Sequence, residues 1–64
     1  MTKTIITKLT ERLNRNLRPN ELEAFKLDRT QSAYQLMLDY VSDKEKSVLE
    51  LEQYVKFIVD ESNS

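Results

Sequence analysis

The stretch AYQLMLDYV, residues 33–41, decides how this fold is interpreted, because seven of its nine side chains are apolar. Its two polar residues, Gln35 and Asp39, are four apart and would share one narrow stripe of a helix. The rest of that helix would be apolar around most of its circumference, and a helix of this kind is normally buried. The sequence therefore predicts a helix that must be covered on more than one side, by the same chain or by a partner.

The small size of the chain is a second reason to expect a partner. A domain of 64 residues usually depends on disulfides, a bound metal or a partner subunit to stabilise its limited core. The sequence has no Cys and no His, so neither disulfides nor an ordinary zinc site are available. We therefore expect a homodimer or a higher oligomer.

The composition excludes most kinds of catalytic site. Gly is absent, so the chain has no phosphate-cradling loop and no dinucleotide-binding fingerprint. The absence of Cys and His also removes the thiol nucleophile and the imidazole base. We expect no enzymatic activity, no cofactor and no metal. The sequence also has no apolar run long enough for a signal peptide or a membrane span, so we expect a cytoplasmic protein without membrane contact.

With no Gly and one Pro, the chain is expected to form one all-α domain with a helical hairpin. Three helices are predicted, at about residues 4–17, 20–41 and 43–60, with a frayed tail at 61–64. Pro19 separates the first two helices, and Asn20 would be the N-cap of the second. Ser42 and Glu45 form a capping-box pattern at the start of the third. The second and third helices would be antiparallel, and the polar stretch 28–32 leaves open whether the second is continuous.

Apolar residues recur at helical spacing in all three segments. The first helix has one such face, made of Ile5, Ile6, Leu9, Leu13 and Leu17. The third has one made of Val48, Leu51, Tyr54, Val55, Ile58 and Val59. The second would have two, of which one contains Leu22, Phe25, Arg29, Ala33, Leu36, Met37 and Tyr40.

The first and third helices are too short to enclose the apolar residues that lie outside these faces. A large uncovered apolar patch usually marks an interaction surface. These residues comprise the other face of the second helix and two positions off the face of the third. The predicted partner or dimer interface is therefore Leu27, Tyr34, Leu38, Val41, Leu49 and Phe57.

Charge is unevenly distributed along the chain. Residues 1–18 carry five basic residues against Glu11 alone, whereas residues 19–64 carry five basic and ten acidic residues. The candidate nucleic-acid contacts on the first helix are Lys8, Arg12 and Arg15. Three basic residues on one face are more typical of a solvated surface, so we expect no specific DNA binding. A ribbon–helix–helix repressor would also need a strand before its two helices, and TKTIITK alternates poorly.

Two longer stretches, LRPNELEAF and DRTQSAYQLMLDYVSDKE, follow this basic first helix. Together with the small size, they resemble the ANR family, the negative regulators of AraC-type activators in enteric pathogens. The resemblance covers roughly residues 5–58. NELEAF followed by QL is also distantly similar to the Hha family of nucleoid-protein partners, although the C-terminal Trp of that family is missing here.

The resemblance to the ANR family implies a small, self-associating α-helical protein. It would bind an AraC-type virulence activator, block the dimerisation or DNA binding of that activator, and also contact the nucleoid protein H-NS. The resemblance assigns no individual contact residue, so the interface residues above depend on the helical pattern alone. Two alternatives remain open. One is a small DNA-binding repressor that uses the basic first helix, and the other is a nucleoid-modulating or antitoxin-like adaptor.

Overall fold

Four helices form where three were expected. The computed structural model describes residues 2–63, and no strand occurs among them. The helices are α1 (Thr2–Leu13), α2 (Pro19–Phe25), α3 (Gln31–Ser42) and α4 (Val48–Ser62). The all-α prediction is confirmed. The ribbon–helix–helix alternative is wrong, because the segment that would have to be its strand is the first part of α1.

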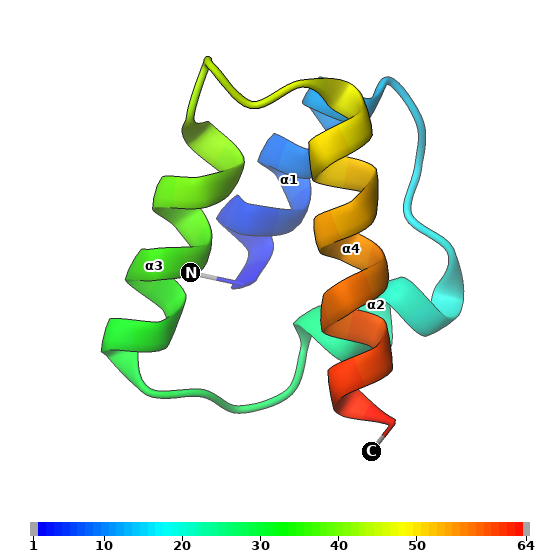
Figure 1. Cartoon of the computed structure of the whole chain (residues 1–64). Coiled ribbons are helices and arrows are strands. Elements are labelled where there is room, and N and C mark those ends of the chain that lie inside the picture. Colours follow the sequence, from blue (N-terminus) through cyan, green and yellow to red (C-terminus); the bar gives the residue numbers. More distant parts are fainter. Residues whose placement is uncertain (1, 64) are drawn as a thin grey trace.

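The helices form two layers in Figure 1, with α3 and α4 in front and running in opposite directions. Behind them, α1 lies between the two and contacts both, while α2 packs mainly against α4 and also contacts α1. The predicted antiparallel orientation of the last two helices is therefore present. However, α3 has α1 as its main neighbour, so the two do not pack on each other as a simple hairpin.

The core is built around α1, in which Ile5, Leu9 and Leu13 are buried as predicted and Ile6 is partly buried. All four helices contribute side chains to the core, and one more comes from the segment between α1 and α2. The buried apolar residues are Ile5, Leu9, Leu13, Leu17, Ala24, Phe25, Met37, Val41, Leu51, Val55 and Ile58. A single copy of the chain thus encloses a continuous apolar cluster.

The predicted helix over residues 20–41 is wrong, because α2 ends at Phe25 and α3 begins at Gln31. The guanidinium of Arg29 donates hydrogen bonds to the carbonyls of Ala24 (2.8 Å) and Leu27 (3.2 Å), and so caps the end of α2. The Tyr34 hydroxyl donates to the Leu27 carbonyl at 3.1 Å and accepts from the Arg29 amide at 3.2 Å. These bonds fix residues 26–30 as a connection.

Thr30 provides the cap that begins α3. Its backbone is extended, and its hydroxyl accepts a hydrogen bond from the amide of Ala33 at 3.1 Å. The sequence left open whether the helix breaks within residues 28–32. It does break there, because Thr30 is the N-cap of a separate helix.

The other helix boundaries also differ from the prediction. α1 ends at Leu13, because the next residue, Asn14, has a positive φ of 56°, which is incompatible with a right-handed helix. Helix α2 begins at Pro19 with Arg18, not Asn20, at its N-cap. α4 continues through Ser62, so the tail is helical over two of its residues, and Ser64 lies outside the described residues.

The capping box of the last helix is shifted by five residues. Ser42 is the last residue of α3, whereas Ser47 is the N-cap of α4. The Ser47 hydroxyl accepts from the Glu50 amide at 3.1 Å, and the Glu50 carboxylate accepts from the Ser47 amide at 3.4 Å. A box of the predicted type is present, but at the second of two Ser-x-x-Glu patterns.

Candidate functional site

The expected second face of the middle helix points mostly into the protein. Val41 is fully buried in the core cluster and is not exposed for an interface. Tyr34 and Leu38 are half-buried and pack against the same core. The break before α3 changes the phase of the helix, and α1 covers this side. Much of the apolar surface that was expected to need a partner is therefore covered by the chain itself.

Large apolar side chains nevertheless remain on the surface of residues 2–63. They are Leu27 (47% exposed), Leu36 (70%), Val48 (53%), Leu49 (67%) and Phe57 (56%). Leu49 and Phe57 lie off the buried face of α4, as the helical spacing predicted. Leu36 and Val48 were assigned to buried faces and are exposed instead. The interface role of Leu27, Leu49 and Phe57 stays a prediction.

Two tyrosines, one on α3 and one on α4, pack against each other. The rings of Tyr40 and Tyr54 are stacked, with centroids 4.2 Å apart and planes 20° apart. The Lys46 ammonium lies 4.8 Å from the centroid of the Tyr40 ring, on the connection between the two helices. Burial raises the pKa of the Tyr54 hydroxyl above its ordinary value. The two helices thus meet through a flat aromatic contact that is partly open to solvent.

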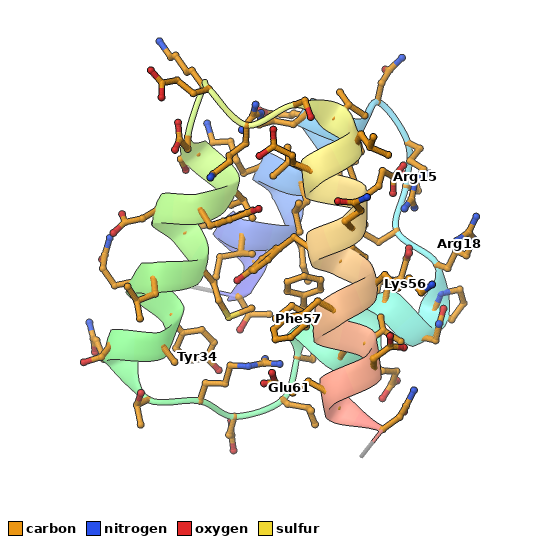
Figure 2. The ribbon with its side chains drawn as sticks, in the orientation of Figure 1. Arg15, Arg18, Tyr34, Lys56, Phe57 and Glu61 are labelled. Carbon is orange, nitrogen blue, oxygen red and sulfur yellow. The ribbon has the colours of Figure 1, made fainter. Side chains whose placement is uncertain are left out.

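Leu36 and Phe57 extend this aromatic contact into one surface. Leu36 lies one turn before Tyr40 on α3, and Phe57 lies three residues after Tyr54 on α4. Because α3 and α4 run in opposite directions, both steps lead the same way along the molecule. Figure 2 shows Phe57 on the viewer's side of α4, toward α3. We call the surface made by Leu36, Tyr40, Tyr54 and Phe57 the α3–α4 face.

Arg12, a candidate nucleic-acid contact, is used inside the fold. Its guanidinium donates hydrogen bonds to the carbonyls of Val41 (3.0 Å), Asp43 (2.6 Å) and Lys46 (2.6 Å). A cation at this position satisfies carbonyls at the end of α3 and holds the following connection in place. The Arg12 guanidinium is therefore bound to backbone carbonyls of the same protein and is not arranged to contact phosphates.

Arg15, the second of these candidates, joins two helices through a pair of carboxylates. Its guanidinium binds both oxygens of Glu21 on α2, at 3.0 and 3.3 Å, and both oxygens of Glu52 on α4, at 3.1 and 2.5 Å. Glu21 is buried, and it also accepts a hydrogen bond from the amide of Arg18 at 2.7 Å. Figure 2 shows Arg15 and Arg18 on the edge of the molecule beside α4.

These contacts change the protonation equilibria of the three groups. Burial alone would raise the pKa of Glu21, but the hydrogen bonds from Arg15 and from the Arg18 amide outweigh it, and this pKa lies below its ordinary value. The hydrogen bonds from Arg15 likewise lower the pKa of Glu52, and the two carboxylates raise the pKa of Arg15. All three groups are therefore held in their charged forms.

Lys8 is the one candidate nucleic-acid contact that remains on an outer surface. It lies beside an open hollow on α1 that is also lined by Lys3, Thr4, Thr7 and Glu11. The predicted basic face is thus dispersed in the structure, since its two arginines turn inward to other helices. No group of acidic, His or Cys side chains suited to a metal ion occurs within residues 2–63.

Comparisons with known proteins do not add a family to this description. No family model matches the chain, and neither a curated protein nor a solved structure matches it. Within the described part of the chain, none of the helices has the length and apolar character that crossing a membrane requires.

Proposed function

We propose that this protein is a cytoplasmic negative regulator of transcription that acts by binding another protein. The observation that carries the proposal is the set of large apolar side chains exposed on α3 and α4, above all Leu36 and Phe57. Exposed apolar residues grouped on a small domain are typical of protein-binding surfaces. The inward direction of Arg12 and Arg15 supports protein binding over nucleic-acid binding.

The target we propose is an AraC-type activator. The support for this target is the likeness of LRPNELEAF and DRTQSAYQLMLDYVSDKE to the ANR family. By covering an apolar surface of the activator, the protein would block either its dimerisation or its DNA binding. H-NS is a further partner that the same likeness implies.

A two-plasmid experiment tests this function. The protein is expressed beside an AraC-type activator and a reporter driven by that activator, and the activator is then purified through an affinity tag. We expect lower reporter output and co-purification of the two proteins in stoichiometric amounts. Unchanged reporter output, with no co-purification from any of several AraC-type activators, would reject the proposed target.

Self-association through apolar helix faces is the second part of the proposal. The half-exposed Leu27, Val48 and Leu49 lie outside the α3–α4 face and provide additional apolar surface. Analytical sedimentation at micromolar concentration should give the mass of a dimer or a higher oligomer. A well-folded monomer at that concentration would reject self-association.

A further inference from the structure

We propose that two copies of this chain exchange α4, because the connection formed by residues 43–47 can change from a turn into part of one continuous helix over residues 31–62. In the resulting dimer, α4 of each copy would pack on α1 and α2 of the other copy. This exchange rests on the self-association part of the proposed function and specifies how the two copies would associate. Three features carry it: the sequence of the 43–47 connection, the phase of the apolar residues on either side, and the contacts that hold the connection as a turn.

The 43–47 connection is composed of residues that a helix accepts. Its sequence, DKEKS, contains no Gly, no Pro and no β-branched residue. Three of its five residues are Lys or Glu, which are among the better helix formers. The local sequence therefore allows α3 to continue into α4 without a break.

The apolar residues of α3 and α4 would fall on one stripe of such a continuous helix. Their positions alternate in steps of four and three residues, with Lys44 as the member within the connection. This seven-residue repeat is typical of a helix with a single apolar seam. The apolar members are Met37, Val41, Val48, Leu51, Val55 and Ile58. The length of the connection thus keeps the buried sides of the two helices in phase.

This phase is what an exchange of α4 requires. Each long helix would bury its first half on its own α1 and its second half on the partner copy, so both halves must use the same side. Two such helices related by a two-fold axis would be antiparallel. Each half of the dimer would then keep the opposite directions of α3 and α4 that Figure 1 shows. Because α3 packs mainly on α1 while α4 packs on α2 and α1, α4 can leave without α3.

The exchange would also cover apolar surface that one copy leaves exposed. Val48 belongs to the apolar stripe but is 53% exposed, and its neighbour Leu49 is 67% exposed. Both lie directly after the connection, near the middle of the helix over residues 31–62. Two antiparallel helices of this length would bring these residues of the two copies together near the two-fold axis.

The turn is held by contacts that a continuous helix would replace. The Arg12 guanidinium donates to the carbonyls of Val41 (3.0 Å), Asp43 (2.6 Å) and Lys46 (2.6 Å). In a continuous helix, the same carbonyls would accept from amides four residues later. Within the turn, the Lys46 amide donates to the Asp43 carbonyl at 3.1 Å, and the Glu45 amide donates to the Asp43 carboxylate at 2.9 Å. Arg12 therefore competes with helix formation in the connection.

A proline at position 44 separates the two forms of the connection. Lys44 is the first central residue of the turn that the Lys46 amide closes, and Pro is favoured at this position. Asp43 has φ −71° and ψ 114°, the extended conformation that a residue before Pro adopts. In a continuous helix the same Pro would remove a hydrogen bond and clash with the preceding turn. Lys44→Pro should therefore keep the fold of one copy and weaken the exchanged dimer by about a hundredfold or more.

The test compares wild type, Lys44→Pro, Lys44→Ala and Arg12→Met as full chains refolded at high protein concentration. Lys44→Ala is the matched control, because it removes the same side chain and still allows a helix. Sedimentation gives the mass, and NMR of mixed dimers, with one isotope-labelled and one unlabelled chain, detects nuclear Overhauser contacts between chains. We expect dimers of wild type and Lys44→Ala, with contacts from buried side chains of α4 in one chain to α1 or α2 in the other. Lys44→Pro should stay monomeric, and Arg12→Met should give a larger dimer fraction than wild type.

Several results would overturn the exchange of α4. A dimer without core contacts between chains would mean association through an outer surface, so that self-association stands and the exchange does not. Monomers of both wild type and Arg12→Met at every concentration would reject both. A Lys44→Pro dimer as abundant as that of wild type would contradict the continuous helix. Circular dichroism melts check that Lys44→Pro folds, and if it does not, the contacts between wild-type chains and the response to Arg12→Met decide.

The reporter experiment separates this exchange from the regulatory function. If no exchange occurs while the protein still represses the reporter, the exchange is wrong and the regulatory function stands. If α4 is exchanged as expected while no AraC-type activator is repressed, the dimer is correct and the proposed target is wrong.

Discussion

Arg12, Arg15 and Arg29 each direct a guanidinium group to a different connection of this small domain. Arg12 binds carbonyls between α3 and α4, Arg15 joins the start of α2 to α4, and Arg29 caps the end of α2. Hydrogen bonds from charged donors are stronger than neutral ones, so these groups stabilise a fold that has no disulfides. None of these roles can be predicted from the sequence, because each depends on contacts that the helical pattern does not specify.

Removal of Arg15 should destabilise the protein more than removal of its neighbour. In Arg15→Met the buried Glu21 loses its principal partner, which costs about 1–3 kcal/mol. The melting temperature should fall by roughly 5–15 °C in a domain of this size. Arg18→Met is the matched control, because the Arg18 side chain is largely exposed and lies 3.7 Å from Glu21. Equal melting temperatures for the two variants would contradict this role of Arg15.

The same carboxylates predict how stability depends on pH. The pKa values of Glu21 and Glu52 lie below the ordinary value of 4.5 in the folded protein, so folding favours their ionised forms. Their contribution is complete above about pH 4.5 and is lost as the pH falls through the lowered pKa values. Thermal melts between pH 6 and pH 3 should therefore show a steeper loss of stability for the wild type than for Arg15→Met. Parallel curves would show that Arg15 does not set these pKa values.

At the scale of the helices, the spacing of apolar residues predicts the buried faces of α1 and α4 but not every helix boundary. The apolar stripe of α1 and the buried side of α4, with Leu51, Val55 and Ile58, could be predicted because their spacing is unambiguous. The break between α2 and α3 could not, because residues 26–30 contain neither Gly nor Pro. Arg29 and Tyr34 make that connection through hydrogen bonds to the backbone, and Thr30 then starts a new helix.

The start of α4 shows a second limit of local patterns. The sequence contains two Ser-x-x-Glu patterns five residues apart, one beginning at Ser42 and one at Ser47. Both satisfy the chemistry of a capping box. The structure uses Ser47, while Arg12, about 30 residues earlier in the chain, binds the connection in front of it. A contact over that separation is not visible in the local sequence.

The candidate site was predicted only in part for the same reason. Phe57 and Leu49 were identified as off-face positions because α4 is regular. Leu36 was missed because its direction was derived from a continuous helix over residues 20–41. Once the connection at 26–30 resets the phase, Leu36 points outward and Val41 inward.

Replacement of Arg12 should loosen one connection more than the rest of the molecule. Arg12→Met removes the donor to the Val41, Asp43 and Lys46 carbonyls. Amide hydrogen exchange should become faster over residues 43–47 and at the end of α3, with a smaller change in α2. Lys8→Met, one turn earlier on the same helix, is the control and should leave the exchange pattern unchanged. Uniformly faster exchange in Arg12→Met would indicate a general loss of stability instead.

For the molecule as a whole, the distribution of charge bears on the DNA-binding alternative. The net charge is −1, and two of the three candidate basic contacts are used internally. Binding through the few basic groups left on α1 would be weak and would fall steeply with salt. An electrophoretic shift assay near 150 mM salt should give no sequence-specific complex at nanomolar protein concentration. A specific complex under these conditions would favour a DNA-binding repressor.

The proposed function requires a core that one chain encloses and, separate from it, an apolar surface that binds another protein. The most direct measurement compares Phe57→Ala and Leu51→Ala by thermal melting and by repression of the activator-driven reporter. Leu51 is fully buried, so its truncation should lower the melting temperature by roughly 10 °C or more. Phe57→Ala should keep the melting temperature within a few degrees of the wild type and still lose repression. A Phe57→Ala variant that represses normally, or one that melts as early as Leu51→Ala, would contradict the account.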